Sequence, residues 1–141
     1  MVTSLLELYG SVIDAHTRKE AIEDGEQVCL SDKCPEGCEM YRYPVYATRA
    51  VWALIEEAIA DEELGQDLVG VVHDLMWMSR QQLKNSSCSS FRFQCIVNGA
   101  ERSPDSVMDG GNHLYTFVLS CGSFDIDDSH PVLTLMFPEE Q

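Results

Sequence analysis

Three cysteines in the first third of the chain come nearest to a metal site in type and spacing. Cys29, Cys34 and Cys38 form a C-x4-C-x3-C pattern, and His16 could supply a fourth ligand. Zinc prefers four thiolate or imidazole donors in a tetrahedral arrangement, and clustered donors on a loop can provide them. Zinc motifs commonly hold two cysteines two residues apart, and this pattern does not. Metal-free, reduced thiols are therefore the alternative to zinc.

A histidine and a carboxylate stand side by side at His73 and Asp74, a pair that could carry acid–base chemistry. Adjacent helical positions point about 100° apart, so we expect these two side chains not to face each other. The sequence contains no Gly-rich phosphate loop, no H-E-x-x-H motif and no nucleophile motif. We therefore expect a non-enzymatic protein. An enzyme would need a pocket in which His73 or His113 meets a perturbed carboxylate.

Three aspartates near the C-terminal end, Asp125, Asp127 and Asp128, could suggest calcium. Calcium loops of the EF-hand type have twelve residues, with a glycine at the turn and a final bidentate glutamate. That pattern is missing, so we expect an acidic, solvated turn over residues 121–129.

Charge is the most unusual property of the chain. Its 141 residues carry nine Lys and Arg against 24 Asp and Glu, for a net charge of −15 and a pI near 4.3. Such a surface lacks the cations needed to bind phosphates, which excludes non-specific binding to nucleic acid or to an anionic membrane. With 45% hydrophobic residues, the chain is expected to fold as one domain over residues 1–141, without help from disulfides or metal.

The acids recur in blocks, and the middle block is the densest. Glu56, Glu63 and Asp67 would share one face of a helix that continued that far, with Glu57 and Asp61 in a neighbouring row. Carboxylates one helical turn apart are about 6 Å from each other, comparable to successive phosphates of a nucleic-acid strand. Their repulsion costs stability, which a basic partner would recover. Acidity that serves only solubility is the alternative.

The ends of the chain point to the cytoplasm. Residues 1–7 lack the basic start and the apolar run of a signal peptide. The longest stretch without a charged residue, 110–124, is too short to span a bilayer. In the cytoplasm the six cysteines are expected to be reduced.

Capping residues and apolar spacing predict three helices. Thr17 and Glu20 form a capping box that opens a short helix, and Asp24-Gly25 closes it. Two longer amphipathic helices follow, with apolar stripes over residues 51–59 and 68–83. Thr48 and Asp67 are the predicted N-caps of these two helices.

Extended segments and loops make up the rest of the chain. Residues 27–30 are a short strand candidate, 31–40 a loop and 41–45 an extended stretch. Alternating residues predict strands over 91–97, 114–120 and 132–137, with a polar loop over 101–112. Together these elements predict an α+β fold, in which an antiparallel three- to four-stranded sheet is packed on one face by the two main helices.

Two stretches resemble a known group of proteins. Residues 12–25, and residues 41–45 followed by 48–52, are similar to segments of a family of small uncharacterised proteins encoded on plasmids, phages and other mobile elements, often near anti-restriction genes. The resemblance covers most of the chain, including residues 132–136. The cysteine loop from 29 to 38 departs from the family pattern, which weakens the case for zinc as a shared feature.

Charge and resemblance together lead to one expectation of function. Some acidic proteins of mobile elements inhibit host nucleases by presenting carboxylates where DNA phosphates would bind. We expect an inhibitor of the anti-CRISPR or anti-restriction type, with a basic host protein or nucleoprotein complex as its partner. The expected contact residues are Glu56, Glu57, Asp61, Glu62, Glu63 and Asp67, followed by Glu23, Asp24 and Glu26. The alternative is a small zinc-binding or regulatory module built on Cys29, Cys34 and Cys38; no other cofactor is expected.

Overall fold

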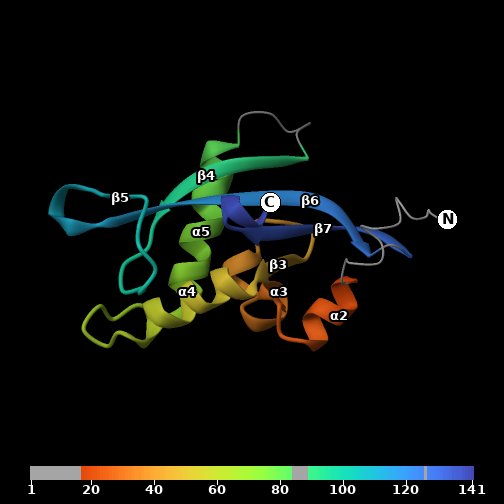
Figure 1. The fold of residues 1–141 in the computed structure, drawn as a ribbon, viewed down its shortest axis with the longest axis horizontal. Coiled ribbons are helices and arrows are strands. Elements are labelled where there is room, and N and C mark those ends of the chain that lie inside the picture. Colours follow the sequence, from red (N-terminus) through yellow and green to blue (C-terminus); the bar gives the residue numbers. More distant parts are fainter. Residues whose placement is uncertain (1–16, 84–88, 126) are drawn as a thin grey trace.

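The computed structural model describes residues 17–83, 89–125 and 127–141, which form an α+β fold with a six-stranded mixed sheet (Figure 1). The helices are α2 (Arg18–Glu23), α3 (Leu30–Lys33), α4 (Arg49–Ala60) and α5 (Leu68–Gln82), with short 3-10 turns η1 (Glu36–Cys38), η2 (Asp109–Gly111) and η3 (Pro138–Glu140). The strands are β2 (Gln27–Cys29), β3 (Val45–Thr48), β4 (Ser90–Ile96), β5 (Ser106–Val107), β6 (His113–Asp125) and β7 (Asp128–Met136).

The three predicted helices are confirmed, and so are their N-caps. The Thr17 side chain accepts from the backbone N–H of Glu20, and the Glu20 carboxylate accepts from the N–H of Thr17. The side chains of Thr48 and Asp67 cap α4 and α5 by accepting from the backbone N–H groups of Val51 and Gly70, without the reciprocal bond of a capping box. Gly25, with a φ of +79°, follows α2 in the left-handed conformation that glycine tolerates best.

The sheet has more strands than predicted, and one pairing is parallel. The strand order is β2-β3-β7-β6-β4, and β5 also pairs with β6. All pairings are antiparallel except that of β3 with β7. The expectation of a three- to four-stranded antiparallel sheet is therefore wrong in number and in this one pairing. β3 lies early in the chain and pairs with its last strand, and alternation within a strand carries no information about such a distant partner.

Three segments predicted as irregular contain regular structure, and one of them is the polar loop over 101–112, which holds β5 and η2. Residues 121–129 are not an acidic turn, because β6 runs to Asp125 and β7 begins at Asp128. The outer part of this hairpin is largely exposed, so its residues need not alternate between apolar and polar. The predicted loop over 31–40 contains η1 and most of α3, elements too short to show a helical period.

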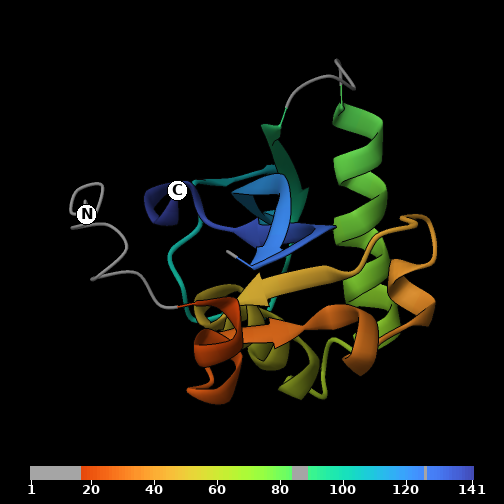
Figure 2. The same ribbon diagram turned by 90° about the vertical axis from the view of Figure 1, so that its right-hand side faces the viewer.

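A single hydrophobic core forms where α4 and α5 pack against one face of the sheet, as predicted. Leu54 of α4 and Leu75 of α5 are buried against sheet residues that pair across strands. Phe93 of β4 pairs with Phe117 of β6, and Leu119 of β6 pairs with Leu135 of β7. Figure 2 shows α5 standing against one side of the sheet. α5 ends at Gln82, and residues 80 and 83 line the cavity described below.

Arg18 at the start of α2 ties the opposite face of the sheet together. Its guanidinium donates to the carbonyl of Phe124, the Gln27 side chain and the Thr134 hydroxyl, at 2.6, 2.8 and 3.0 Å. The same guanidinium lies 5.1 Å from the centre of the Tyr46 ring. Arg18 therefore joins β2, β6 and β7, and is committed to contacts within the fold.

Candidate functional site

The predicted acidic site lies at the end of α4 and in the loop that leads to α5. α4 ends at Ala60, and Asp61 adopts an extended backbone conformation. Gly65 then takes a φ of +63°. The expectation that Glu56, Glu63 and Asp67 share one helix face is therefore wrong, because the helix does not continue beyond residue 60. The acids instead follow a helix end and a surface loop.

Three of the predicted carboxylates hold the local backbone. Asp61 accepts from the N–H of Glu63 at 3.1 Å. Asp67 accepts from the N–H of Gly70 at 2.8 Å and so caps α5. Glu57 accepts from the N–H of Glu101 at 2.9 Å, which links α4 to the segment after β4. These side chains have structural roles whatever else they contact.

The other three carboxylates of the predicted acidic site, those of Glu56, Glu62 and Glu63, are exposed. The stretch 50–79 contains no lysine or arginine in the sequence. Within the described parts of the chain, the ion pairs found join Arg102 to Glu139 and two histidines to neighbouring aspartates, and none involves these three glutamates. We refer to Glu56, Glu62 and Glu63 as the free acidic edge.

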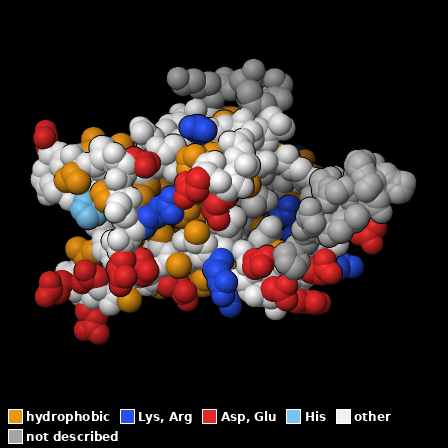
Figure 3. Space-filling model, viewed as in Figure 1, with side chains coloured by type: hydrophobic (Ala, Val, Ile, Leu, Met, Phe, Trp, Pro, Cys, Tyr) orange, Lys and Arg blue, Asp and Glu red, His pale blue; other side chains and the backbone are white. Residues whose placement is uncertain are grey.

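The second predicted group, Glu23, Asp24 and Glu26, lies at the other end of α4. The N–H of Arg49, the first residue of α4, donates to the carbonyl of Glu26 at 2.8 Å. The twelve residues of α4 span about 18 Å, which separates the two acidic groups. Figure 3 shows acidic side chains gathered towards both ends of the lower edge, with a basic side chain between them.

The cysteines predicted as zinc ligands lie largely inside the core. Cys34 and Cys38 are 1% and 5% exposed, and Cys29 is half-buried. Burial raises the pKa of Cys38 to about 11, which disfavours the thiolate that zinc would need. Among the described residues, no group of three or more His, Cys, Asp or Glu side chains is placed to hold a metal ion. His16 lies outside the described residues.

The histidines considered for acid–base chemistry occupy different surroundings. His73 Nδ1 lies 3.7 Å from Asp74 Oδ1, so the expectation that they point apart is wrong, although both side chains are largely exposed. The His73 ring also stacks on Trp77, which is 50% exposed. The Nδ1 of His113 is buried and has no hydrogen-bond partner in the described structure, so no carboxylate pairs with that atom.

The calcium alternative rests on three aspartates at the tip of the β6–β7 hairpin. The Asp125 carboxylate accepts from the N–H groups of Arg18 and Lys19, each at 3.3 Å. Asp128 accepts from the His130 ring and N–H, and these bonds lower the pKa of its carboxyl. Both carboxylates thus serve local contacts.

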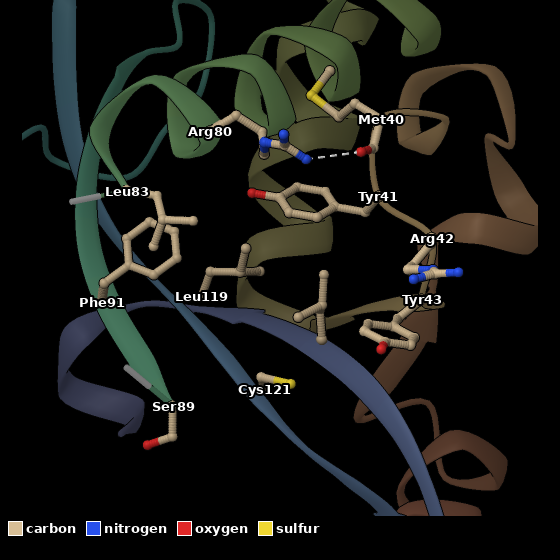
Figure 4. Close-up of a pocket in the computed structure, with 11 residues that line it drawn as sticks. Met40, Tyr41, Arg42, Tyr43, Arg80, Leu83, Ser89, Phe91, Leu119 and Cys121 are labelled. Atoms are coloured by element: carbon tan, nitrogen blue, oxygen red, sulfur yellow. Dashed lines mark hydrogen bonds between the residues drawn. The ribbon is translucent and has the colours of Figure 1, made fainter. Parts of the chain in front are cut away.

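A cavity of about 360 Å³ was not predicted from the sequence (Figure 4). It lies between the last turns of α5, the segment 40–43 and the sheet. Arg42 and Arg80 line it although they are far apart in sequence. A local pattern does not reveal such a meeting, because it depends on where α5 ends.

No helix among the described residues is both long enough and apolar enough to cross a membrane. Neither the curated proteins nor the solved structures contain a match to the chain. The model of one protein family, a family of unknown function (DUF6573), matches residues 8–141. This match covers nearly the whole sequence, and the chain therefore belongs to the DUF6573 family.

Proposed function

We propose that this protein is a non-enzymatic inhibitor that occupies a basic, nucleic-acid-binding surface of a host defence nuclease or its nucleoprotein complex. The proposal includes the anti-CRISPR or anti-restriction setting suggested by the resemblance to proteins of mobile elements. The free acidic edge makes the primary contact. The group around Glu23, Asp24 and Glu26, at the other end of α4, makes a second.

The observation that carries the proposal is the exposure of Glu56, Glu62 and Glu63 with no cation nearby in sequence. Glu56 lies one turn before the end of α4, and the stretch 50–79 around it contains no lysine or arginine. Glu62 and Glu63 are adjacent and repel each other within a Debye length of about 8 Å. An arrangement that costs stability in the free protein is favoured once cations surround it.

Acidity that serves solubility alone predicts a different response to mutation. A solubility role depends on the total charge and not on where the charges lie. A binding role depends on position, because a cationic groove must meet several carboxylates at once. Reversing the same number of charges at two different places on the surface therefore distinguishes a binding role from a solubility role.

The experiment uses the full chain, immobilised and exposed to nuclease-treated lysate of a bacterial host. We expect it to retain a cationic DNA-binding protein that duplex DNA displaces. We also expect the complex to dissociate when ionic strength rises from about 0.1 M to about 1 M, which shortens the Debye length from about 10 Å to about 3 Å. The retained protein is then purified and its affinity for each variant is measured.

The test variant replaces Glu56, Glu62 and Glu63 by lysine. The matched control replaces three other exposed acids by lysine: Glu36, Glu39 and Asp109. We expect affinity to fall about 100-fold for the first, or about 3 kcal/mol at roughly 1 kcal/mol per reversed charge. The control should stay within a few-fold of wild type. Equal losses of affinity in both variants would contradict the proposal. So would a pull-down that retains no protein displaced by duplex DNA.

A further inference from the structure

The pocket at the C-terminal end of α5 has a largely apolar interior. Leu119 of β6 and Leu133 of β7 line it. Figure 4 shows Phe91 of β4, Leu83 after α5 and Leu119 on neighbouring sides of the pocket. These side chains lie beside the last residues of α5. The cavity of about 360 Å³ is within the range of small-molecule sites, roughly 300–1,000 Å³.

The polar groups of the pocket are cationic or neutral. Two of the nine basic residues of the chain, Arg42 and Arg80, line it, and none of the 24 acidic residues is found among its described lining residues. In a protein with a net charge of −15, a pocket lined by two arginines and by no acidic residue of the described chain is unusual. Charge complementarity therefore favours an anion at this position.

Arg80 is held in place by groups from the segment opposite α5. Its Nη1 donates to the carbonyl of Met40 at 3.0 Å, and its guanidinium lies 5.5 Å from the centre of the Tyr41 ring. The Tyr41 hydroxyl is in turn hydrogen-bonded to Ser79 at 2.6 Å. A guanidinium has five N–H donors, and the bond to Met40 uses only one nitrogen, so Arg80 can still bind a carboxylate.

We propose that this pocket binds a small organic anion with an apolar body, such as a medium-chain carboxylate. The carboxylate pairs with Arg80, and Arg42 adds to the positive potential at the mouth. The hydrocarbon chain lies against Phe91, Leu119 and Leu133.

This site is separate from the free acidic edge. Arg80 lies near the C-terminal end of α5, and Asp67, next to the acidic loop, caps its N-terminal end. The helix of 15 residues spans about 22 Å. Binding in the pocket is thus independent of the proposed inhibitory contact, and either proposal can fail without the other.

The test compares three ligands that share an eight-carbon chain: octanoate, octanol and octylammonium. Calorimetry with the full chain is expected to show saturable, one-to-one binding of octanoate, at least tenfold weaker binding of octanol and none of octylammonium. The variant Arg80→Gln should lower octanoate affinity about tenfold. The control Arg92→Gln, on the exposed face of β4, should not change it. Absent octanoate binding, equal binding of octylammonium, or equal loss in both variants would overturn the proposal.

Cys121 provides a second readout that needs no substitution. Its thiol is exposed and lines the pocket, whereas Cys29 lies in β2, outside it. Octanoate should slow the alkylation of Cys121 by N-ethylmaleimide, followed by peptide mass spectrometry, and leave the rate at Cys29 unchanged. Unchanged alkylation at Cys121 under saturating octanoate would place the ligand elsewhere and overturn the assignment.

Discussion

At the scale of single residues, the carboxylates divide by what their oxygen atoms contact. Asp61 accepts a backbone N–H group within the loop and Asp67 accepts one from the first turn of α5, so removal of either carboxylate would leave its donor without that partner. Glu56, Glu62 and Glu63 are exposed, and their carboxylates accept no such bond from the described part of the chain. Charge reversal at these three positions therefore tests binding, whereas reversal at Asp61 would also disturb the loop.

The buried thiols make the stability of the protein depend on pH in the alkaline range. Burial, with the nearby charge of Asp74, raises the pKa of Cys95 to about 12, and burial raises that of Cys38 to about 11. Above pH about 9 the unfolded chain releases thiol protons that the folded chain retains. The free energy of unfolding thus falls as pH rises, by up to about 1.4 kcal/mol per pH unit for each thiol.

Urea unfolding at about pH 8 and about pH 10 measures this effect. Among the described residues, Cys29, Cys38 and Cys95 have a raised thiol pKa, and Cys95→Ala removes one of these three thiols. Between these pH values we therefore expect the free energy of unfolding of Cys95→Ala to fall by about 1 kcal/mol less than that of wild type. Cys121→Ala, at an exposed thiol, should keep the wild-type dependence. An identical pH dependence in wild type and Cys95→Ala would show that the Cys95 pKa is not raised.

At the scale of the elements, local signals were predictable and distant pairings were not. The caps at Thr17, Thr48 and Asp67 are formed within three residues along the chain, so the sequence predicts them directly. The parallel pairing of β3 with β7 joins Val45 to Leu133. Many sequences would alternate as these strands do without forming that pair. Which strand β3 pairs with depends on how α4 and α5, which follow β3 in the chain, pack on the sheet.

The candidate site, too, was predictable from the sequence only where it depends on local residues. The sequence predicted which acids gather near residues 56–67, because composition alone shows it. It did not show where α4 ends, because Asp61 leaves the helix through a hydrogen bond to Glu63 that competes with helix continuation. Nor could it show the pocket, whose walls come from α5, the segment 40–43 and three strands.

The edge strand β4 is protected by a side chain of α5. The Gln82 amide donates to the carbonyl of Gln94 at 2.7 Å and accepts from its N–H at 2.8 Å. These are outward-facing backbone groups that another chain could otherwise pair with. We expect Gln82→Leu to lower the free energy of unfolding by about 1–2 kcal/mol, since two hydrogen bonds are lost, and to promote self-association.

Urea unfolding and sedimentation across a range of protein concentrations provide the measurements. Gln81→Leu is the matched control, because Gln81 is the exposed neighbour on the same helix. It adds the same apolar side chain without uncovering the edge. Equal self-association of both variants would attribute the effect to surface hydrophobicity and not to β4.

At the scale of the whole molecule, the excess negative charge is unevenly distributed. The free acidic edge and the group at Glu23, Asp24 and Glu26 lie at opposite ends of α4, whereas the pocket beyond α5 is lined by two arginines. The same chain thus presents regions of opposite potential about one helix length apart. A cationic macromolecule and a small anion would approach different parts of the surface.

The lysine variant of the free acidic edge should be more stable than wild type while binding its partner less well. Each substitution adds two units to a net charge of −15, which reduces the electrostatic repulsion within the folded protein. At low salt we expect the free energy of unfolding to rise by about 1 kcal/mol, and at about 1 M salt the gain should largely vanish because screening removes the repulsion. Loss of partner binding together with this gain excludes unfolding as the cause. A variant less stable than wild type at every salt concentration would mean that these glutamates support the fold, and the case for a surface kept acidic for binding would fail.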